Sequence, residues 1–151
     1  MKYQVERIKS CIDEISQLFL NHWAEIAGHQ DTVPLDPDFA RYQRREDDGM
    51  LRIFTDRNGH DHTLIGYFIT FISPHIHYKS TIYGINDILY VHPDHRGGTV
   101  GYRLIKGAMV DLKINCNVDI LVIHMKIKHE FRKLLVALGF SPAEENWEAQ
   151  L

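Results

Sequence analysis

The segment that could do the most specific chemistry lies in the second half of the chain, where an arginine and three glycines follow an apolar stretch. It runs from Val91 to Gly101 and reads Val-His-Pro-Asp-His-Arg-Gly-Gly-Thr-Val-Gly. Glycine lets the backbone approach a bulky group closely, and the first turn of a helix exposes N–H groups without intrahelical partners. A helix that begins here would offer main-chain amides, its positive dipole end and the charge of Arg96 to an anion. The pattern predicts a phosphate or diphosphate site.

Two common phosphate-binding loops do not explain this segment. The Walker loop ends in Gly-Lys-Ser or Gly-Lys-Thr, and residues 96–101 contain no lysine. The dinucleotide-binding loop has the spacing G-x-G-x-x-G after the first strand of a parallel unit. Here the glycines are residues 97, 98 and 101, and they follow a stretch that we expect to be antiparallel.

The first third of the chain is predicted to form a short strand and two helices. Residues 3–7 indicate the strand. An apolar stripe with spacings of three and four then predicts a helix that ends at Gly28; the stripe consists of Ile8, Ile12, Ile15, Phe19, Trp23 and Ile26. Ser10, with an aspartate three residues later, has capping-box spacing near the start of this helix. Asp36-Pro37 predicts the cap and first residue of a second helix, which ends at Gly49.

The rest of the chain is predicted to form an antiparallel meander that leads into a parallel β-α-β unit. Asn58-Gly59 is typical of a tight hairpin turn. The predicted elements are strands over residues 50–55, 63–72 and 81–91, a helix over 99–113, an apolar strand over 118–124, a helix over 128–138 and a last strand around Trp147. We therefore expect an α/β (α+β) fold with a mixed, mostly antiparallel sheet.

Composition places the chain among ordinary globular proteins. Its 151 residues, 44% hydrophobic and 25% charged, predict one domain over residues 1–151. The formal net charge of −3 argues against a protein that coats nucleic acid, because such domains are usually basic. No apolar run reaches about 18 residues, so we expect no membrane span. Cys11 and Cys116 match neither a disulfide scaffold nor a zinc site, which indicates reduced thiols and a cytoplasmic protein.

Three features together resemble the GNAT superfamily of N-acetyltransferases. The segment Val91-x-Pro93-x-x-Arg96-Gly97-Gly98-Thr99-Val100-Gly101, followed by Leu104, is similar to that family's acetyl-CoA loop, Arg/Gln-x-x-Gly-x-Gly/Ala after the fourth strand. Residues 134–140, Leu-Leu-Val-Ala-Leu-Gly-Phe, are similar to its second signature, a helix that ends in Leu-Gly-Phe. Gly66 fits the glycine usual in the family's hairpin strand. The likeness in element order spans nearly the whole chain, and the small size resembles phage-encoded members.

The resemblance implies a GNAT fold in which strands 81–91 and 118–124 separate to admit acetyl-CoA or CoA as a co-substrate. It implies that the diphosphate lies on the main-chain amides of residues 98–101, near Arg96. The pantetheine arm would pair with the backbone of residues 89–91, like an added strand. The cofactor-binding residues implied in this way are Leu89, Tyr90, Val91, Arg96, Gly97, Gly98, Thr99, Val100 and Gly101.

The chain departs from the family pattern at two positions. Thr99 stands where the first motif glycine is usual; it still offers its N–H, and we expect its hydroxyl to cap the helix. Leu135 occupies the position where many members carry a tyrosine general acid. Leucine cannot donate a proton, so another group protonates the CoA thiolate, or the thiolate leaves unassisted, or the fold is no longer catalytic.

Two residues are candidates for the group that removes a proton from the amine. Strict alternation puts Asp87 on the strand face of Leu89 and Val91, and family members with a carboxylate base often keep it upstream on this strand. The alternative for Asp87 is a pairing with an arginine or a loop cap. His124, at the end of the fifth strand, is the second candidate acid or base; its alternative is an ordinary, partly exposed histidine. Tyr90 should face the opposite side and join the core.

We expect no metal. The clusters His60-Asp61-His62, His75-Ile76-His77 and His92-x-x-His95 lack a third ligand at a diagnostic spacing. We interpret His75 and His77 either as contacts to substrate or as ordinary solvated side chains.

In the family, the first two helices and their connection form a wall of the acceptor site. The acidic Asp31, Asp36 and Asp38 mildly favour a cationic acceptor, and the charged run of residues 41–48 is interpreted as a solvated helix face.

These observations support one main function and one alternative. The main one is a CoA-dependent N-acyltransferase that moves an acetyl group to an amine of a small molecule or protein by direct attack in a ternary complex, since neither cysteine has a histidine partner visible in sequence. The alternative is a catalytically degenerate module on the same scaffold that binds CoA or a protein partner, because a shared fold does not fix the chemistry. A homodimer is compatible with the family, whereas nucleic-acid and membrane partners are not expected.

Overall fold

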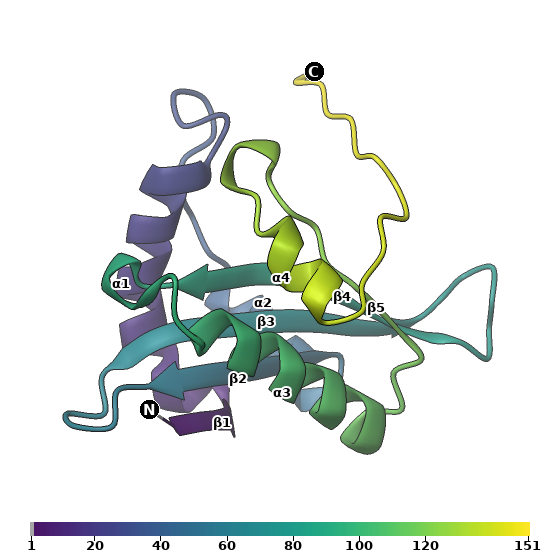
Figure 1. The fold of residues 1–151 in the computed structure, drawn as a ribbon. Helices are drawn as coiled ribbons and strands as arrows, with labels where there is room; N and C mark the ends of the chain where they lie inside the picture. Colours follow the sequence, from purple (N-terminus) through teal and green to yellow (C-terminus); the bar gives the residue numbers. More distant parts are fainter. Residues whose placement is uncertain (1) are drawn as a thin grey trace.

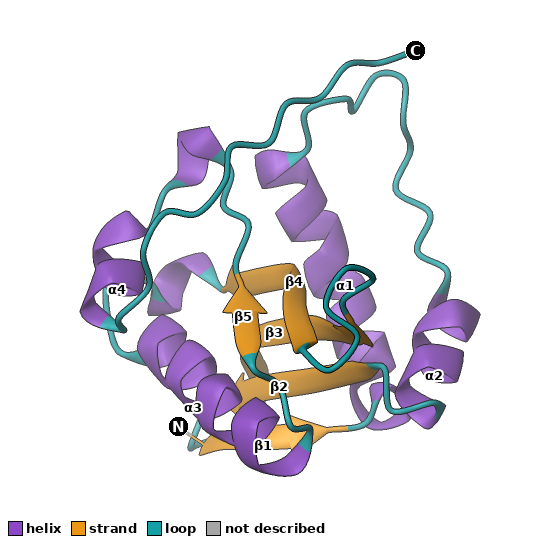
Figure 2. Ribbon diagram, turned by 90° about the vertical axis from the view of Figure 1, so that its right-hand side faces the viewer, coloured by secondary structure: helices purple, strands orange, loops and turns teal. Residues whose placement is uncertain are grey.

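The computed structural model describes residues 2–151, except for the side chain of His129, as a twisted five-stranded sheet with helices on both faces (Figures 1 and 2). The strands lie in the sheet in chain order: β1 (Lys2–Glu6), β2 (Leu51–Arg57), β3 (Leu64–Pro74), β4 (Ile82–Val91) and β5 (Ile120–Val122). The first four are antiparallel, and β5 runs parallel to β4. The predicted meander and β-α-β unit are therefore confirmed.

The helices divide between the two faces because successive strand residues point to opposite sides. Helices α1 (Ile8–Ile26) and α2 (Phe39–Asp47) pack on the face that carries Ile53 and Tyr67. Helix α3 (Val100–Asn115) packs on the face that carries Phe54 and Phe68. In Figure 2, α3 and α4 (Arg132–Ala137) lie on one side of the sheet and α2 lies on the other. The sheet is thus buried on both faces at its centre.

Helix α1 contains the predicted apolar stripe, but the predicted capping box at Ser10 is wrong. The helix begins at Ile8, its cap residue Arg7 makes no side-chain cap bond, and the Ser10 hydroxyl donates back to the carbonyl of Arg7. The N–H of Ile8 instead donates to a Glu46 carboxylate oxygen at 2.9 Å, 38 residues away in α2. The first N–H of the helix has no partner within the helix, and a carboxylate from another helix accepts its hydrogen bond in place of a local side chain.

Helix α2 begins later than the sequence indicates and ends where predicted. Asp38, rather than Asp36, is its cap, and its carboxylate accepts a hydrogen bond from the N–H of Arg41 at 2.8 Å. Gly49 follows the helix with a φ of +71°, the left-handed conformation in which glycine commonly ends a helix.

The hairpin between β2 and β3 has the predicted strands but a different turn. Asn58-Gly59 does not supply the positive φ; His62 does, at +60°. The N–H of Asn58 donates to the carbonyl of Thr63 and closes a six-residue loop over residues 58–63. An irregularity in the pairing at Asp56/Arg57 ends the regular ladder earlier on this side, so the two strands do not meet at a two-residue turn.

The C-terminal elements are shorter than predicted. Strand β5 spans only Ile120–Val122, because the N–H of Val118 still donates to Leu112 at the end of α3. The predicted helix over 128–138 is divided into a 3₁₀ turn, Ile127–His129, and α4. Residues 141–151 form no strand, and Trp147 is 89% exposed. This tail passes the end of α1, where Glu148 lies 3.5 Å from the imidazole of His29.

Candidate active site

The glycine-rich segment adopts the predicted arrangement of strand, turn and helix. Strand β4 ends at Val91, a 3₁₀ turn covers Pro93–His95, and α3 begins at Val100. Gly97 has a φ of +76°, which explains why glycine is needed there. Thr99 is the cap residue of α3, but its side chain makes no cap bond; its hydroxyl oxygen accepts from the guanidinium of Arg103 instead. The expectation that the Thr99 hydroxyl caps the helix is therefore wrong.

Arg96 connects this loop to strand β4 and to helix α1. Its Nε donates to the carbonyl of Val91 at 2.8 Å. Its two terminal nitrogens make a bidentate pair with Glu25 near the end of α1, at 2.6 and 2.7 Å. The guanidinium carbon also lies 5.7 Å from the centre of the Tyr90 ring. The positive charge of Arg96 is thus paired with a carboxylate in this structure.

A β-bulge in β4 changes the direction of Asp87. Ile69 of β3 pairs with Ile88, and the next residue, Thr70, pairs with Asn86, so Asp87 is an extra residue in β4. The prediction that Asp87 shares a face with Leu89 and Val91 is wrong. Its carboxylate accepts a hydrogen bond from the hydroxyl of Tyr42 in α2, on the side where Tyr90 is buried as predicted.

The pair of Tyr42 and Asp87 is electrostatically unusual. Burial raises the pKa of Asp87, and the hydrogen bond from Tyr42 offsets part of the rise. Burial and the neighbouring carboxylate raise the pKa of Tyr42 far above its usual range. Asp87 keeps an exposed edge towards solvent. Asp87 is therefore a carboxyl group of raised pKa whose side chain is accessible from solvent.

Strands β4 and β5 part immediately before this bulge. Their ladder ends with the pair Ile85 and Val122. At the next position the side-chain amide of Asn86 replaces strand pairing: its oxygen accepts from the N–H of His124 at 2.5 Å and its nitrogen donates to the His124 carbonyl at 3.2 Å. The side chain of Asn86 therefore marks and holds the point of separation.

Beyond that point, β4 has an edge that β5 does not cover within residues 2–151. The N–H of His92 donates to Ile65 of β3. Because main-chain groups alternate in direction along an antiparallel strand, those of Leu89 and Val91 point away from β3, towards the parted side. The Val91 carbonyl accepts from Arg96, which leaves the N–H of Val91 and both main-chain groups of Leu89 as the part of this edge that could pair with an extended ligand.

The two predicted catalytic residues, Asp87 and His124, are held by different contacts: Asp87 bonds to Tyr42 of α2, and His124 bonds to Asn86 through its main chain. His124 lies beyond the end of β5, is exposed, and is held through its main chain by Asn86. Its side chain makes no hydrogen bond to Asp87 within the described residues. Two residues that bond to these candidates, Tyr42 and Asn86, are not among the site residues predicted from the sequence. Nothing local in the sequence indicates either one, because Tyr42 is 45 residues from Asp87 and Asn86 is 38 residues from His124.

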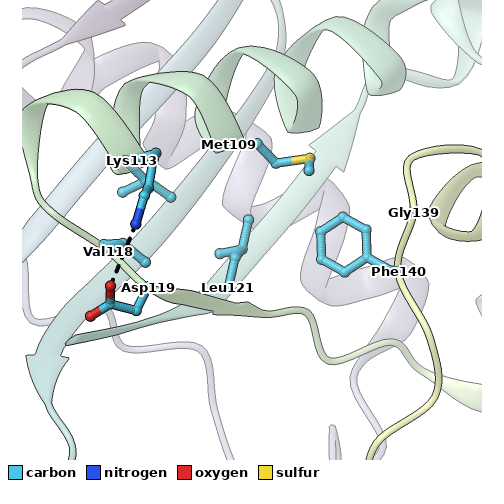
Figure 3. A pocket seen from close by; sticks show the side chains of 8 residues that line it. Met109, Lys113, Val118, Asp119, Leu121, Gly139 and Phe140 are labelled. Atoms are coloured by element: carbon cyan, nitrogen blue, oxygen red, sulfur yellow. Dashed lines mark hydrogen bonds and ion pairs between the residues drawn. The ribbon is translucent and has the colours of Figure 1, made fainter. Parts of the chain in front are cut away.

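Two cavities lie on opposite faces of the sheet. One, of about 510 Å³, is on the α2 side and is lined by Pro37, Asp38, Arg41, Tyr42, Arg45 and Phe71. The other, of about 270 Å³ and shown in Figure 3, is lined by Met109, Leu112, Lys113, Val118, Asp119, Leu121, Gly139 and Phe140. An ion pair between Lys113 and Asp119, 3.4 Å long, crosses one end of this second cavity.

The Leu-Gly-Phe sequence has a clear structural purpose beside the second cavity. Gly139 has a φ of +89°, its N–H donates to the carbonyl of Val136, and the N–H of Phe140 donates to the carbonyl of Leu135. These two bonds form a Schellman motif that ends α4 and turns Phe140 towards α3 (Figure 3). Leu135 is half-buried in α4, and its carbonyl, rather than its side chain, makes the polar contact.

The histidine clusters do not gather into a larger polar site. His75, in the turn between β3 and β4, stacks on Tyr78 and also contacts the ring of Tyr83 in a tilted arrangement. Within residues 2–151, no group of three or more histidine, cysteine, aspartate or glutamate side chains is placed to hold a metal ion.

Comparison with solved structures identifies this architecture. A ribosomal-protein-alanine N-acetyltransferase from Brucella melitensis superposes with a TM-score of 0.70 over 100% of both chains, at 20% identity. An aminoglycoside acetyltransferase from an uncultured soil sample, in complex with trehalose, gives 0.68 over 99% of this chain and 93% of its own, at 12% identity. The chain has the GNAT fold. A structure described as a transcriptional regulator from Bacillus halodurans gives 0.76 over 99% of both chains, at 14% identity.

At these identities the likeness is one of fold. No protein-family model matches the sequence, and no curated protein does either.

The packing of this fold explains Gly66, because a Cβ atom there would lie 3.0 Å from the Tyr90 carbonyl oxygen and 3.1 Å from both Leu104 and Val100 of α3. Of the helices described in residues 2–151, none is both long and apolar enough to cross a bilayer.

Proposed function

We propose that this GNAT-fold protein is a CoA-dependent N-acyltransferase that moves an acetyl group from acetyl-CoA to an amine. The observation that carries the proposal is the position of Asp87: a carboxyl group of raised pKa, on the bulge where β4 parts from β5. A general base works best when its pKa lies nearer the working pH than that of an ordinary aspartate. The glycine-rich turn and the start of α3 follow on the same strand.

In the proposed complex the co-substrate lies along the parted edge of β4. The diphosphate sits on the main-chain amides of residues 98–101, at the positive end of α3. The pantetheine arm pairs with the backbone of residues 89–91. With the co-substrate bound in this way, its thioester lies beside the bulge of β4. The backbone there departs from the regular hydrogen-bond ladder of the strands, so a main-chain amide can polarise the acetyl carbonyl.

The reaction is a direct transfer. The amine nitrogen attacks the acetyl carbon, the new C–N bond forms, and the C–S bond breaks with its electron pair on sulfur. The proton lost by the amine goes to the carboxylate of Asp87. Leu135 cannot protonate the sulfur, so CoA leaves as a thiolate; a thiol with a pKa of about 8.5 is an adequate leaving group without an acid. His124 is the reserve candidate for proton transfer, because its exposed side chain follows the parted end of β5.

The first experiment tests CoA binding. Acetyl-CoA should raise the melting temperature, because a ligand stabilises the state that it binds. Gly101→Glu should abolish the rise, because a Cβ atom there already lies 3.3 Å from Leu134 and the added carboxylate repels the diphosphate. Lys106→Gln, on the exposed side of α3, changes the net charge by the same amount and should keep it. An unchanged rise in Gly101→Glu would contradict the placement of the loop.

The second experiment tests catalysis. Release of free thiol from acetyl-CoA should require an amine, and Asp87→Asn should reduce it by about 10²–10⁴-fold, the usual contribution of a positioned base. The alternative of a degenerate CoA-binding module is favoured only by Leu135. Saturable acetyl-CoA binding with no thiol release across amines, peptides and aminoglycosides would establish that alternative.

A further inference from the structure

Helix α2 has its two kinds of charge on different sides. Its acidic residues face α1: Glu46 and Asp47 both pair with Arg7, and Glu46 also accepts from the N–H of Ile8. Its basic residues Arg41 and Arg45 line the 510 Å³ cavity beside Phe71. The charged run that the sequence predicts to be a solvated helix face is therefore divided, and of its charged residues Arg41 and Arg45 line the cavity.

The arginines of α2 differ from those elsewhere in the chain. The protein has nine arginines, and six of them pair with a carboxylate: Arg7, Arg52, Arg57, Arg96, Arg103 and Arg132. Within residues 2–151, Arg41, Arg44 and Arg45 have no such ion pair. Arg45 lies over the Phe71 ring at 5.2 Å. Arg41 and Arg45 are one helical turn apart and so lie on the same helix face.

The one acidic residue that lines the cavity already accepts a backbone hydrogen bond through one of its two carboxylate oxygens. Asp38 is the cap of α2, and its carboxylate accepts from the N–H of Arg41 at the positive end of the helix. The cavity therefore presents two guanidinium groups without carboxylate partners, one apolar ring and one phenol. A guanidinium group is shaped to bind a carboxylate through two parallel hydrogen bonds.

Tyr42 joins this cavity to the proposed base. Its side chain lines the cavity, and its ring lies 6.1 Å from that of Phe71. Its hydroxyl, at the far end of the side chain, donates to Asp87. Asp87 itself does not line the cavity, but this hydrogen bond sets its carboxylate at the end of a cavity-lining side chain, so an acceptor held at the arginines reaches Asp87 by extending past Tyr42.

We propose that this cavity binds a carboxylate of the acceptor through Arg41 and Arg45, so that the substrate is an amine that also carries a carboxylate. The inference rests on the proposed function, because it assigns the amine end to Asp87. It replaces the expectation of a cationic acceptor drawn from Asp31, Asp36 and Asp38, of which only Asp38 lines the cavity.

Matched acceptors test the proposal. Thiol release should be measured with γ-aminobutyrate and ε-aminocaproate as acceptors. Each acid is compared with its own carboxamide, which keeps the amine and removes the negative charge of the carboxylate. Short peptides ending in a free acid or an amide form a second arm that distinguishes free amino acids from acidic peptides. The acid should be preferred by about tenfold or more in kcat/KM, the effect of one charge-assisted hydrogen bond. A ratio near one in both arms would overturn the inference and leave the transferase function intact.

Variants of α2 locate the effect. Arg41→Gln and Arg45→Gln should each lower the acid-to-amide ratio severalfold, and the double variant should bring it near one. Arg44→Gln is the matched control, because Arg44 is on the same helix and has no ion pair but does not line the cavity; it should keep the ratio. Equal loss in all three variants would indicate a general charge effect and overturn the assignment.

A binding measurement separates this inference from the catalytic one. Butyrate, which has the carboxylate without an amine, should bind the protein in calorimetry, and Arg45→Gln should weaken that binding about tenfold or more. This readout needs no turnover, so it stands even if no amine is acetylated, which would overturn the proposed function alone. Absence of butyrate binding at millimolar concentration, with no preference for acids, would overturn the cavity assignment.

Discussion

The hydroxyl of Tyr42 on α2 donates a hydrogen bond to the carboxylate of Asp87 on the bulge of β4, across 45 residues of sequence. Each group changes the pKa of the other, Tyr42 lowering that of Asp87 and Asp87 raising that of Tyr42. The phenol lowers the pKa of Asp87 against the larger rise caused by burial, and the carboxylate adds to the rise in the pKa of Tyr42. Because its pKa is raised far above its usual range, Tyr42 stays a protonated donor near neutral pH, and its hydrogen bond fixes the orientation of the carboxyl group that we propose as the base.

Tyr42→Phe should shift the pH dependence of acetyl transfer. A donor that stabilises the charged carboxylate is lost, so the pKa of Asp87 rises further. Asp87 then needs a higher pH to be deprotonated, and the acid limb of the kcat/KM profile should move to higher pH. The control is Tyr67→Phe, because the Tyr67 hydroxyl is buried on the same face without a hydrogen-bond partner; it should leave the limb in place. A shift of the limb to lower pH would contradict the assignment.

Asn86 should stabilise the junction at which β4 and β5 part. Asn86→Leu removes both hydrogen bonds to the main chain of His124 and should cost about 2 kcal/mol of unfolding free energy, at about 1 kcal/mol for each bond. Urea unfolding measures this directly. Asn115→Leu is a suitable comparison, because Asn115 is exposed and its side-chain amide donates to Asp111 one turn earlier; its effect should stay within about 0.5 kcal/mol. Equal stability of the two variants would show that the bridge is unimportant.

The features that the sequence predicts correctly are those set by local patterns. The apolar stripe of α1, the strands β2 and β3, and Gly49 as a helix end all depend on neighbouring residues. The turn at residues 96–99 is predicted for the same reason, because glycine at a positive φ has a local steric cause. The order of the strands follows, since consecutive antiparallel strands usually lie side by side.

The features that the sequence does not predict depend on residues far apart. The start of α1 is set by Glu46, which no pattern around Ser10 reveals. The direction of Asp87 depends on a bulge, which is a property of the pairing between β3 and β4 and not of the alternation within β4 alone. The charge of Arg96 is predicted to serve the diphosphate, and its pairing with Glu25 spans 71 residues. The candidate base was thus found from sequence, whereas its neighbours were not.

Gly66→Ala should destabilise the protein through its backbone. A Cβ atom would lie 3.0 Å from the carbonyl oxygen of Tyr90, which cannot move without disturbing β4, and 3.1 Å from Leu104 and Val100. Overpacking of this kind costs about 1–3 kcal/mol, measurable by thermal or urea unfolding. Gly98→Ala is the control, because the nearest atom to its Cβ is 3.9 Å away. A Gly66→Ala protein as stable as Gly98→Ala would mean that α3 can withdraw from the sheet at little cost.

Arg96 and Glu25 offer a test of whether a paired charge still serves the co-substrate. If the guanidinium contributes electrostatically, Arg96→Ala should weaken acetyl-CoA binding, and Glu25→Gln should strengthen it a fewfold, because the competing carboxylate charge is gone while a hydrogen-bonding side chain remains. The strengthening should fade as salt rises from about 0.01 M to 0.15 M, where the Debye length falls from about 30 to 8 Å. Calorimetry of both variants at two salt concentrations measures this. Equal weakening in both, independent of salt, would show instead that the pair only holds the loop against α1 and the end of β4.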